Sequence, residues 1–189
     1  MENVVKQTRY TTTAIVLHWI VAIGIIANVI LAWVFEYIPD AHIRLAIDTH
    51  KSLGITLLGF ALLRLLWRFT HKPPAYPIKQ NVLEKFLAKA THAMLYFLML
   101  MLPISGWVHD SAWIAAPEIP MNLFGLFEWP RITYVMDLGA EAKKTVHTIT
   151  GCMHTYFSYA LYALVFLHVS AALMHHFSPT KRVRGRGII

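Results

Sequence analysis

Residues 147–177 read HTITGCMHTYFSYALYALVFLHVSAALMHHF, and this stretch decides the fold. Four of its histidines, His147, His154, His168 and His175, are separated by 7, 14 and 7 residues. A helix carries residues with this spacing in a line down one face, because 14 residues make about four turns less about 40 degrees. His154 and His168 lie inside the apolar run, about 21 Å apart along the axis, where an imidazole without a partner is costly. The stretch therefore predicts a buried helix whose histidines have partners.

The composition indicates that this helix lies in a membrane. The 189-residue chain is 57% hydrophobic and 14% charged, with a mean hydropathy of +0.50, which leaves too little polar surface for a soluble globule. Four apolar stretches are long enough to span about 30 Å of hydrocarbon as helices. We expect an all-α fold, an integral membrane four-helix bundle that forms a single domain over 1–189. The predicted helices are 14–35, 45–67, 88–108 and 150–177.

The connection between the last two helices, about 109–149, is unusually long. It contains three prolines and several aromatic side chains, among them Trp113, Phe124, Phe127 and Trp129. Structureless loops of this length are uncommon, and aromatic rings favour the depth of the lipid headgroups. We therefore expect this segment to lie on the bundle as an outer lid, with its last part extending the fourth helix.

Basic residues predict the orientation. Of the 17 Lys and Arg residues, 12 lie in the N-terminal segment, around the connection of helices 2 and 3, or in the C-terminal tail. The opposite side carries five, against eight of the ten acids, so both termini are expected to be cytoplasmic. The net charge of +7 is explained by this asymmetry and by contact with anionic membrane lipid, and no nucleic-acid motif accompanies it. We expect no nucleic-acid partner.

The histidines of different helices fall at two depths. His18 in helix 1 and His168 in helix 4 lie at similar inner levels, whereas His50 in helix 2 and His154 in helix 4 lie at outer levels. Two facing imidazole pairs suit two six-coordinate haems, each iron taking one nitrogen from either side. A structural zinc site needs about four ligands at one level. The single cysteine, Cys152, excludes a C-x-x-C-H attachment, so any haem is held without a covalent link.

Several motifs together resemble the bacterial cytochrome b561 family over nearly the whole chain. They are His18-Trp19, HKSLGI at 50–55, RLLWR at 64–68, His92 with Leu95-Tyr96, Ser105-Gly106, His154, His168 and HHF at 175–177. The resemblance implies a four-helix cytochrome with two haem b groups, which exchanges electrons with the quinone pool in the bacterial inner membrane as a multi-pass protein. Matching positions imply His18 and His168 as ligands of the inner haem iron, and His50 and His154 as ligands of the outer one.

Other histidines leave the ligand set open at two points. His147 lies one heptad before His154 and is an alternative outer ligand, although His154 keeps the 14-residue spacing to His168. His92 is an alternative to His18 at the inner level. We expect His92 and His175 instead to line a pocket for ubiquinone or another quinone, where an imidazole donates a hydrogen bond to a carbonyl and passes a proton. The histidines at boundary positions are expected to be solvated: His42, His71, His109 and His176.

The favoured function is electron transfer between the quinone pool and a periplasmic donor or acceptor, such as a redox protein. One alternative is a superoxide oxidase that reduces ubiquinone, which would make the protein a quinone-linked oxidoreductase. The outer segments disfavour long-range steering of an anion because acids outnumber bases there, although Arg44, Lys51, Lys143 and Lys144 form a potential local patch. Another alternative is a membrane anchor subunit of a dehydrogenase or hydrogenase.

Overall fold

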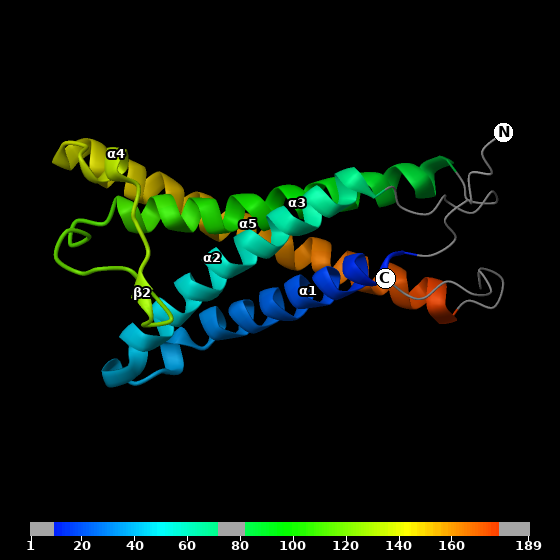
Figure 1. The fold of residues 1–189 in the computed structure, drawn as a ribbon, viewed down its shortest axis with the longest axis horizontal. Helices are drawn as coiled ribbons and strands as arrows, with labels where there is room; N and C mark the ends of the chain where they lie inside the picture. The colour runs from blue at the N-terminus through cyan, green and yellow to red at the C-terminus, as the bar shows by residue number, and fades with distance from the viewer. Residues whose placement is uncertain (1–9, 72–81, 178–189) are drawn as a thin grey trace.

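Four long helices run back and forth along one axis (Figure 1). The computed structural model describes residues 10–71 and 82–177, except for the side chains of residues 175 and 176. The long helices are α1 (Thr12–Trp33), α2 (Asp40–Thr70), α3 (Val82–Ser111) and α5 (Ala140–Phe177). A short 3-10 turn, η1 (Phe35–Tyr37), joins α1 to α2, and two strands and a short helix lie between α3 and α5: β1 (Asn122–Leu123), β2 (Phe127–Glu128) and α4 (Thr133–Met136).

The membrane fold is confirmed. All four long helices are long and apolar enough to cross a bilayer. Many of their apolar side chains are exposed on the outside of the bundle, which would be unfavourable in water: Phe69 is 76% exposed and Leu66 is 61% exposed. The small buried cluster contains Val21, Ala61 and Met99, which come from three different helices. Lipid rather than a thick apolar core therefore covers most of the helix surfaces.

The helices extend beyond the predicted apolar spans at most of their ends. α5 begins at Ala140, as expected for an extension of the fourth helix into the last part of the connection, and α3 continues to Ser111. The prediction bounded each helix by its apolar residues, but helical hydrogen bonds are local and continue through polar turns outside the hydrocarbon. Only residues 112–139, which we call the outer segment, therefore lie between α3 and α5. The first helix instead ends at Trp33, before η1.

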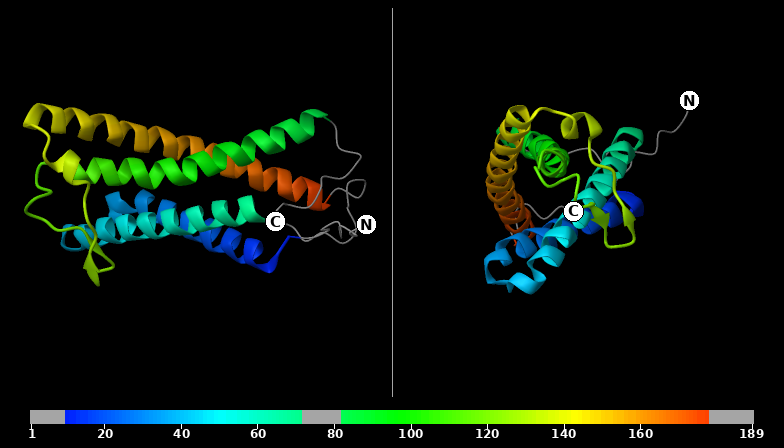
Figure 2. Two further views of the ribbon diagram at one scale, coloured as in Figure 1. Left: turned by 45° about the horizontal axis from the view of Figure 1, so that its top comes forward. Right: turned by 90° about the vertical axis from the view of Figure 1, so that its left-hand side faces the viewer.

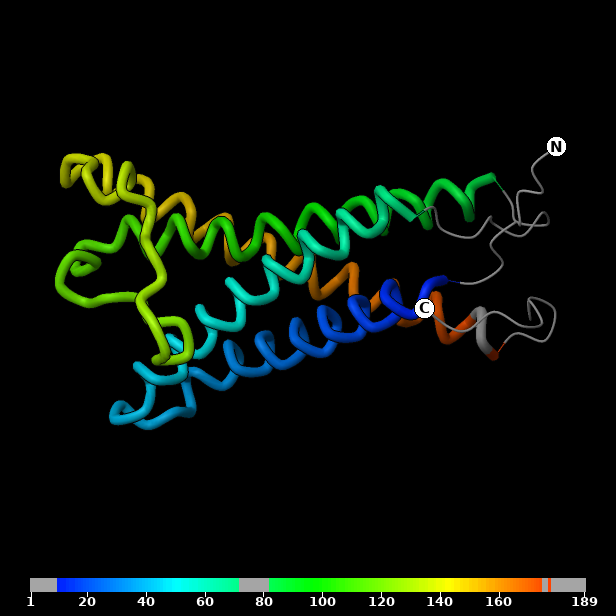
Figure 3. The backbone as a smooth tube through the Cα atoms, in the orientation of Figure 1, coloured from blue at the N-terminus to red at the C-terminus, as the bar shows by residue number. Residues whose placement is uncertain are grey.

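The bundle consists of two helix pairs. α1 packs against α2, α3 packs against α5, and contacts between α2 and α3 join the pairs. Figure 2 shows the pairs as separate layers that cross at an angle, and Figure 3 traces the same course through the Cα atoms. The start of α1 and the end of α5 lie at one end of the bundle, and the outer segment lies at the other. At the first end, Trp67 Nε1 donates a hydrogen bond of 2.8 Å to Thr11 Oγ1, the residue that caps α1.

The outer segment packs on α2, as expected for a lid. Its antiparallel strands β1 and β2 are joined by a tight turn in which Phe124 and Gly125 have φ values of 51° and 71°. A positive φ is strained for a bulky residue such as phenylalanine. The Phe124 amide donates a hydrogen bond of 2.9 Å to Oγ of the fully buried Ser52. This bond helps to hold the turn against the membrane helix.

A buried ion-pair network ties the outer segment to two helices. The Asp110 carboxylate, near the end of α3, accepts hydrogen bonds from Lys51 Nζ of α2 and, at 2.8 Å, from Arg131 Nε of the outer segment. The Arg131 side chain is only 5% exposed and also donates to the carbonyl oxygens of Ala116 and Ile119. One carboxylate therefore neutralises two cations from separate parts of the chain.

Replacing this carboxylate tests its structural role. Asp110→Ala leaves two partly or fully buried cations without their partner, so we expect the apparent free energy of unfolding to fall by about 3–5 kcal/mol. Denaturant titration of the purified protein in detergent measures it. The control is Arg44→Ala, which removes a more exposed pair with Asp48 and is expected to cost about 0–1 kcal/mol. Equal losses in the two variants would contradict the assignment.

Candidate histidine centre between the helix pairs

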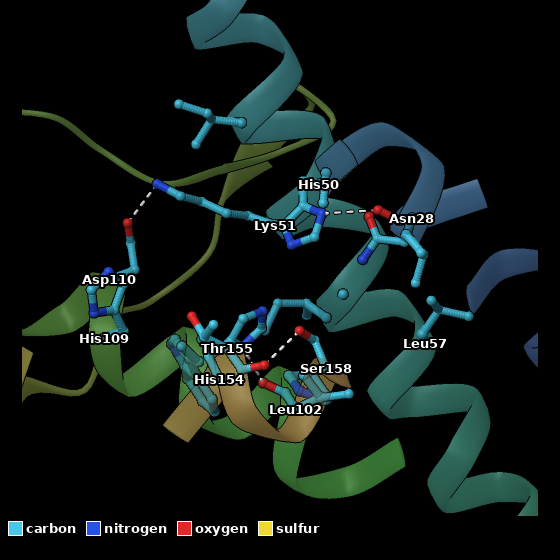
Figure 4. A pocket seen from close by; sticks show the side chains of 18 of the residues that line it. Asn28, His50, Lys51, Leu57, Leu102, His109, Asp110, His154, Thr155 and Ser158 are labelled. Atoms are coloured by element: carbon cyan, nitrogen blue, oxygen red, sulfur yellow. Dashed lines mark hydrogen bonds and ion pairs between the residues drawn. The ribbon is translucent and has the colours of Figure 1, made fainter. Parts of the chain in front are cut away.

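A cavity of about 870 Å³ opens between the two helix pairs toward the outer end of the bundle. All four long helices contribute to its walls, which are mostly apolar. Its polar side chains include four histidines: His50, His109, His147 and His154. Figure 4 shows His50 on α2 and His154 on α5 on opposite walls. The helix pairs thus leave a space in which imidazoles from different helices face each other.

His50 and His154 form the outer pair. Their ring centroids are 6.2 Å apart and their planes are inclined by 74°. His50 Nδ1 is 3.3 Å from the Asn28 carbonyl oxygen, and His154 Nδ1 is 3.0 Å from the Leu102 carbonyl oxygen. A carbonyl accepts only from N–H, so these contacts place the proton of each neutral ring on Nδ1. Nε2 of each ring is then free to act as a metal ligand, which is how protein backbones commonly orient ligating histidines.

Glycine allows the outer pair to form. A Cβ atom at Gly106 of α3 would lie 3.2 Å from both Cε1 and Nδ1 of His154. Such a contact is tighter than an ordinary van der Waals separation, so any side chain at this position presses on the ring. The glycine in the Ser105-Gly106 motif is therefore explained by the close approach of α3 to the imidazole of α5.

His18 and His168 form the inner pair. Their ring centroids are 6.4 Å apart with planes inclined by 69°. The His18 Nδ1 atom is buried and has no hydrogen-bond partner among the described residues. The ring of His92 on α3 also lies close to His168, with 5.6 Å between the two ring centroids. The inner level thus holds three imidazoles from three helices.

Basic and aromatic side chains surround the inner imidazoles. The guanidinium groups of Arg64 and Arg68 lie 5.3 Å and 5.7 Å from the centroid of the Tyr96 ring, within the range of cation–π attraction. His175, the second residue of the predicted quinone pocket, lies in the last turns of α5, but its side chain is outside the described part of the chain. Its predicted role therefore stays a prediction.

His109 was expected to be solvated, but its ring stacks on that of His147 in the structure. Both rings are half-buried and stack with centroids 3.8 Å apart and planes inclined by 21°. His109 Nδ1 lies 2.8 Å from the His147 carbonyl oxygen, and His147 Nδ1 lies 3.0 Å from the His109 carbonyl oxygen. Sequence spacing on one helix does not reveal a partner on another. The sequence did contain one indication, since His147 lies seven residues before His154 and His109 lies three residues after Gly106.

The four-helix membrane fold agrees with comparisons to known proteins. Residues 9–184 match the prokaryotic cytochrome b561 family. The chain belongs to this family. It is 30% identical over 185 residues to cytochrome b561 homolog 2 of Escherichia coli strain K12, covering 94% of this chain and 92% of that protein. It is 28% identical over 177 residues to a protein of Yersinia pestis named probable superoxide oxidase CybB, covering 89% of each chain.

Membership of the cytochrome b561 family implies that the chain binds haem b, and its imidazoles fit that group. A metal ligated by imidazole nitrogen lies about 2.0–2.1 Å from it, so two axial rings have centroids about 6–6.5 Å apart. The outer and inner pairs have separations of 6.2 Å and 6.4 Å. Among residues 10–71 and 82–177 no group of three or more His, Cys, Asp or Glu side chains is arranged to hold a bare metal ion. The donor set thus suits an axial pair better than a closed metal site.

A larger side chain at position 106 tests the outer pair. Gly106→Val adds three carbon atoms next to the His154 ring, so we expect the hydrogen bond to Leu102 to break and the haem content of the purified protein to fall. The matched control is Gly59→Val, at a helical glycine with no atom within 4 Å of the added Cβ. Haem-to-protein ratios from the pyridine haemochrome spectrum measure the effect. An unchanged ratio in Gly106→Val would contradict the assigned contact.

Proposed function

We propose that the protein is a transmembrane dihaem b-type cytochrome that transfers electrons between the quinone pool and a periplasmic donor or acceptor. The single observation that supports it is the presence of two facing imidazole pairs at two depths of one membrane bundle. In this proposal His18 and His168 ligate the inner haem iron, and His50 and His154 ligate the outer one. When bound, haem b supplies a one-electron iron couple whose potential the ligands and their surroundings adjust.

Ring geometry supports this choice among the alternative ligands. At the outer level, the His147 ring stacks on His109, whereas His154 faces His50 at the separation suited to an axial pair. At the inner level, His92 is 5.6 Å from His168, closer than two axial rings normally lie, whereas His18 is 6.4 Å away. We therefore assign His154 rather than His147, and His18 rather than His92.

The inner end is the proposed quinone site. Reduction of a quinone takes two electrons and two protons, so a site needs a proton donor beside an electron donor. His92 lies beside the inner pair and can donate a hydrogen bond to a quinone carbonyl, with His175 as the second predicted lining residue. Arg64 and Arg68 supply positive charge at the same end of the bundle. Ubiquinone or another membrane quinone would enter from the lipid.

The proposed orientation places this end at the cytoplasm of a bacterial inner membrane. The start of α1, the end of α5 and the basic turns at the end of α2 lie together at one end of the bundle. Basic residues favour the cytoplasmic side. The outer pair and the outer segment then face the periplasm, where the second redox partner binds.

Charge pairing at the outer end favours a partner protein over an anion as the outer substrate. Lys51 and Arg131 share the carboxylate of Asp110, and Arg44 donates a hydrogen bond of 2.9 Å to Asp48. Three cations beside the cavity are thus offset by two carboxylates, which weakens attraction of a small anion. Superoxide oxidation is the second candidate, because a relative that is 28% identical carries that name.

Removing one ligand at a time tests the two-haem proposal. We expect His154→Ala to abolish the outer haem and His168→Ala the inner one, each lowering haem content by about half, because a six-coordinate b-type haem depends on both axial nitrogens. His42→Ala, which changes an exposed histidine of α2, is the control and should keep the full content. A wild-type protein without a b-type spectrum, or a single loss that removes both haems or neither, would contradict the proposal.

Mixing with superoxide separates the two outer substrates. Under the partner-protein proposal, stopped-flow mixing of the oxidised cytochrome with superoxide reduces the b-type haem only slowly. The rate constant, followed in the visible spectrum, is about 100-fold or more below the diffusional ceiling of about 10⁸–10⁹ M⁻¹s⁻¹. Reduction near that ceiling would instead establish superoxide as the outer substrate. Increasing ionic strength provides the control, since a steered anion reacts more slowly in salt.

A further inference from the structure

The stacked pair of His109 and His147 has no role in the proposed ligand sets. The two residues come from antiparallel helices, and each ring bonds through Nδ1 to the backbone carbonyl oxygen of the other residue. A Cβ atom at Gly151 would lie 2.9 Å from Cε1 of His109 and 3.0 Å from its Nδ1, so the glycine provides the space that this ring occupies. Reciprocal bonds and a fitted space on the facing helix indicate a built arrangement rather than a chance contact.

The protonation of the pair follows from these bonds. A carbonyl oxygen is only an acceptor, so each Nδ1 carries a hydrogen and each neutral ring has Nε2 as its remaining acceptor. The rings are nearly parallel at 3.8 Å, so their Nε2 lone pairs do not converge as chelation of one metal ion would require. Two stacked imidazolium rings would repel each other. The pair is therefore suited to take up one proton at Nε2.

The position of the pair joins this capacity to the outer redox centre. His109 and His147 line the same cavity as His50 and His154, and both are partly exposed at its outer end. The neighbouring charges are already engaged: Lys51 of α2 and Arg131 of the outer segment pair with Asp110 of α3. On α5, Lys143 precedes His147 by one turn, and the described residues of α1 include no Asp, Glu, Lys or Arg. With Nε2 of His50 and His154 assigned to a haem iron, the Nε2 atoms of His109 and His147 are the imidazole proton acceptors left among the described residues that line the cavity.

We propose that His109 and His147 form a proton-accepting pair that compensates the charge of each electron entering the outer haem. This inference rests on the proposed function. With haem bound at the outer pair, an electron arriving from the outer donor would be accompanied by one proton taken from periplasmic water to Nε2 of His109 or His147. The proton would return to water when the electron moves on to the inner haem. A negative charge added to a low-dielectric cavity attracts a proton, so reduction and protonation favour each other.

The inference predicts a pH-dependent potential at the outer haem alone. The pair holds the proton more tightly when the outer haem is reduced, so its pKa is higher in the reduced state than in the oxidised state. The reduction potential of the outer haem therefore falls as pH rises between these two pKa values and is constant outside that range. The experiment is a redox titration of the full-length protein at several pH values, monitored in the visible spectrum and fitted to two haems. The component that is missing from His154→Ala identifies the outer haem.

The test variants are His109→Gln and His147→Gln. A glutamine amide can still donate to the facing carbonyl oxygen but does not titrate, so we expect the fold and haem content to remain and the pH-dependent part of the outer potential to be lost. His42→Gln is the control and should keep the wild-type dependence. The inference would be overturned if the outer-haem potential depended on pH in both variants as it does in the wild type. It would also be overturned if either variant lost a haem, since the replaced histidine would then be a ligand. A wild-type protein with no haem would overturn the proposed function itself.

Discussion

The structure depends on the cost of placing an imidazole in hydrocarbon. Each ring has two nitrogens that need partners, and lipid supplies none. His50 and His154 satisfy Nδ1 with backbone carbonyl oxygens of α1 and α3, which turns Nε2 of both rings into the space between the helix pairs. That space requires the pairs to separate, which is why α1 and α2 form one layer and α3 and α5 another. Proposed ligation and helix packing are thus two aspects of one arrangement.

Three successive residues of α2 connect the parts of the outer end. Because successive helical positions are separated by about 100 degrees, His50, Lys51 and Ser52 point in different directions. His50 faces His154 across the cavity, Lys51 pairs with Asp110 of α3, and Ser52 accepts the hydrogen bond from the Phe124 amide. The proposed ligand, the buried ion pair and the outer segment are therefore held in register by a single helical turn.

The sequence was sufficient to predict the membrane bundle and the two depths at which His18 lies near His168 and His50 near His154. Both followed from the length of the apolar stretches and from the depth at which His18, His50, His154 and His168 enter them. The helix ends were predicted less well, since polar turns beyond the membrane remain helical. The Asp110 network and the His109 stack were missed, because depth along an axis does not specify which faces of two helices meet outside the hydrocarbon.

Electron paramagnetic resonance of the oxidised protein tests the central claim most directly, since it reports the axial ligands of ferric haem. Two imidazoles at each iron give low-spin signals, and planes inclined by 69° and 74°, far from parallel, give them large anisotropy. The account predicts two low-spin ferric centres per chain. A high-spin centre with an open axial position, or only one haem signal per chain, would contradict it.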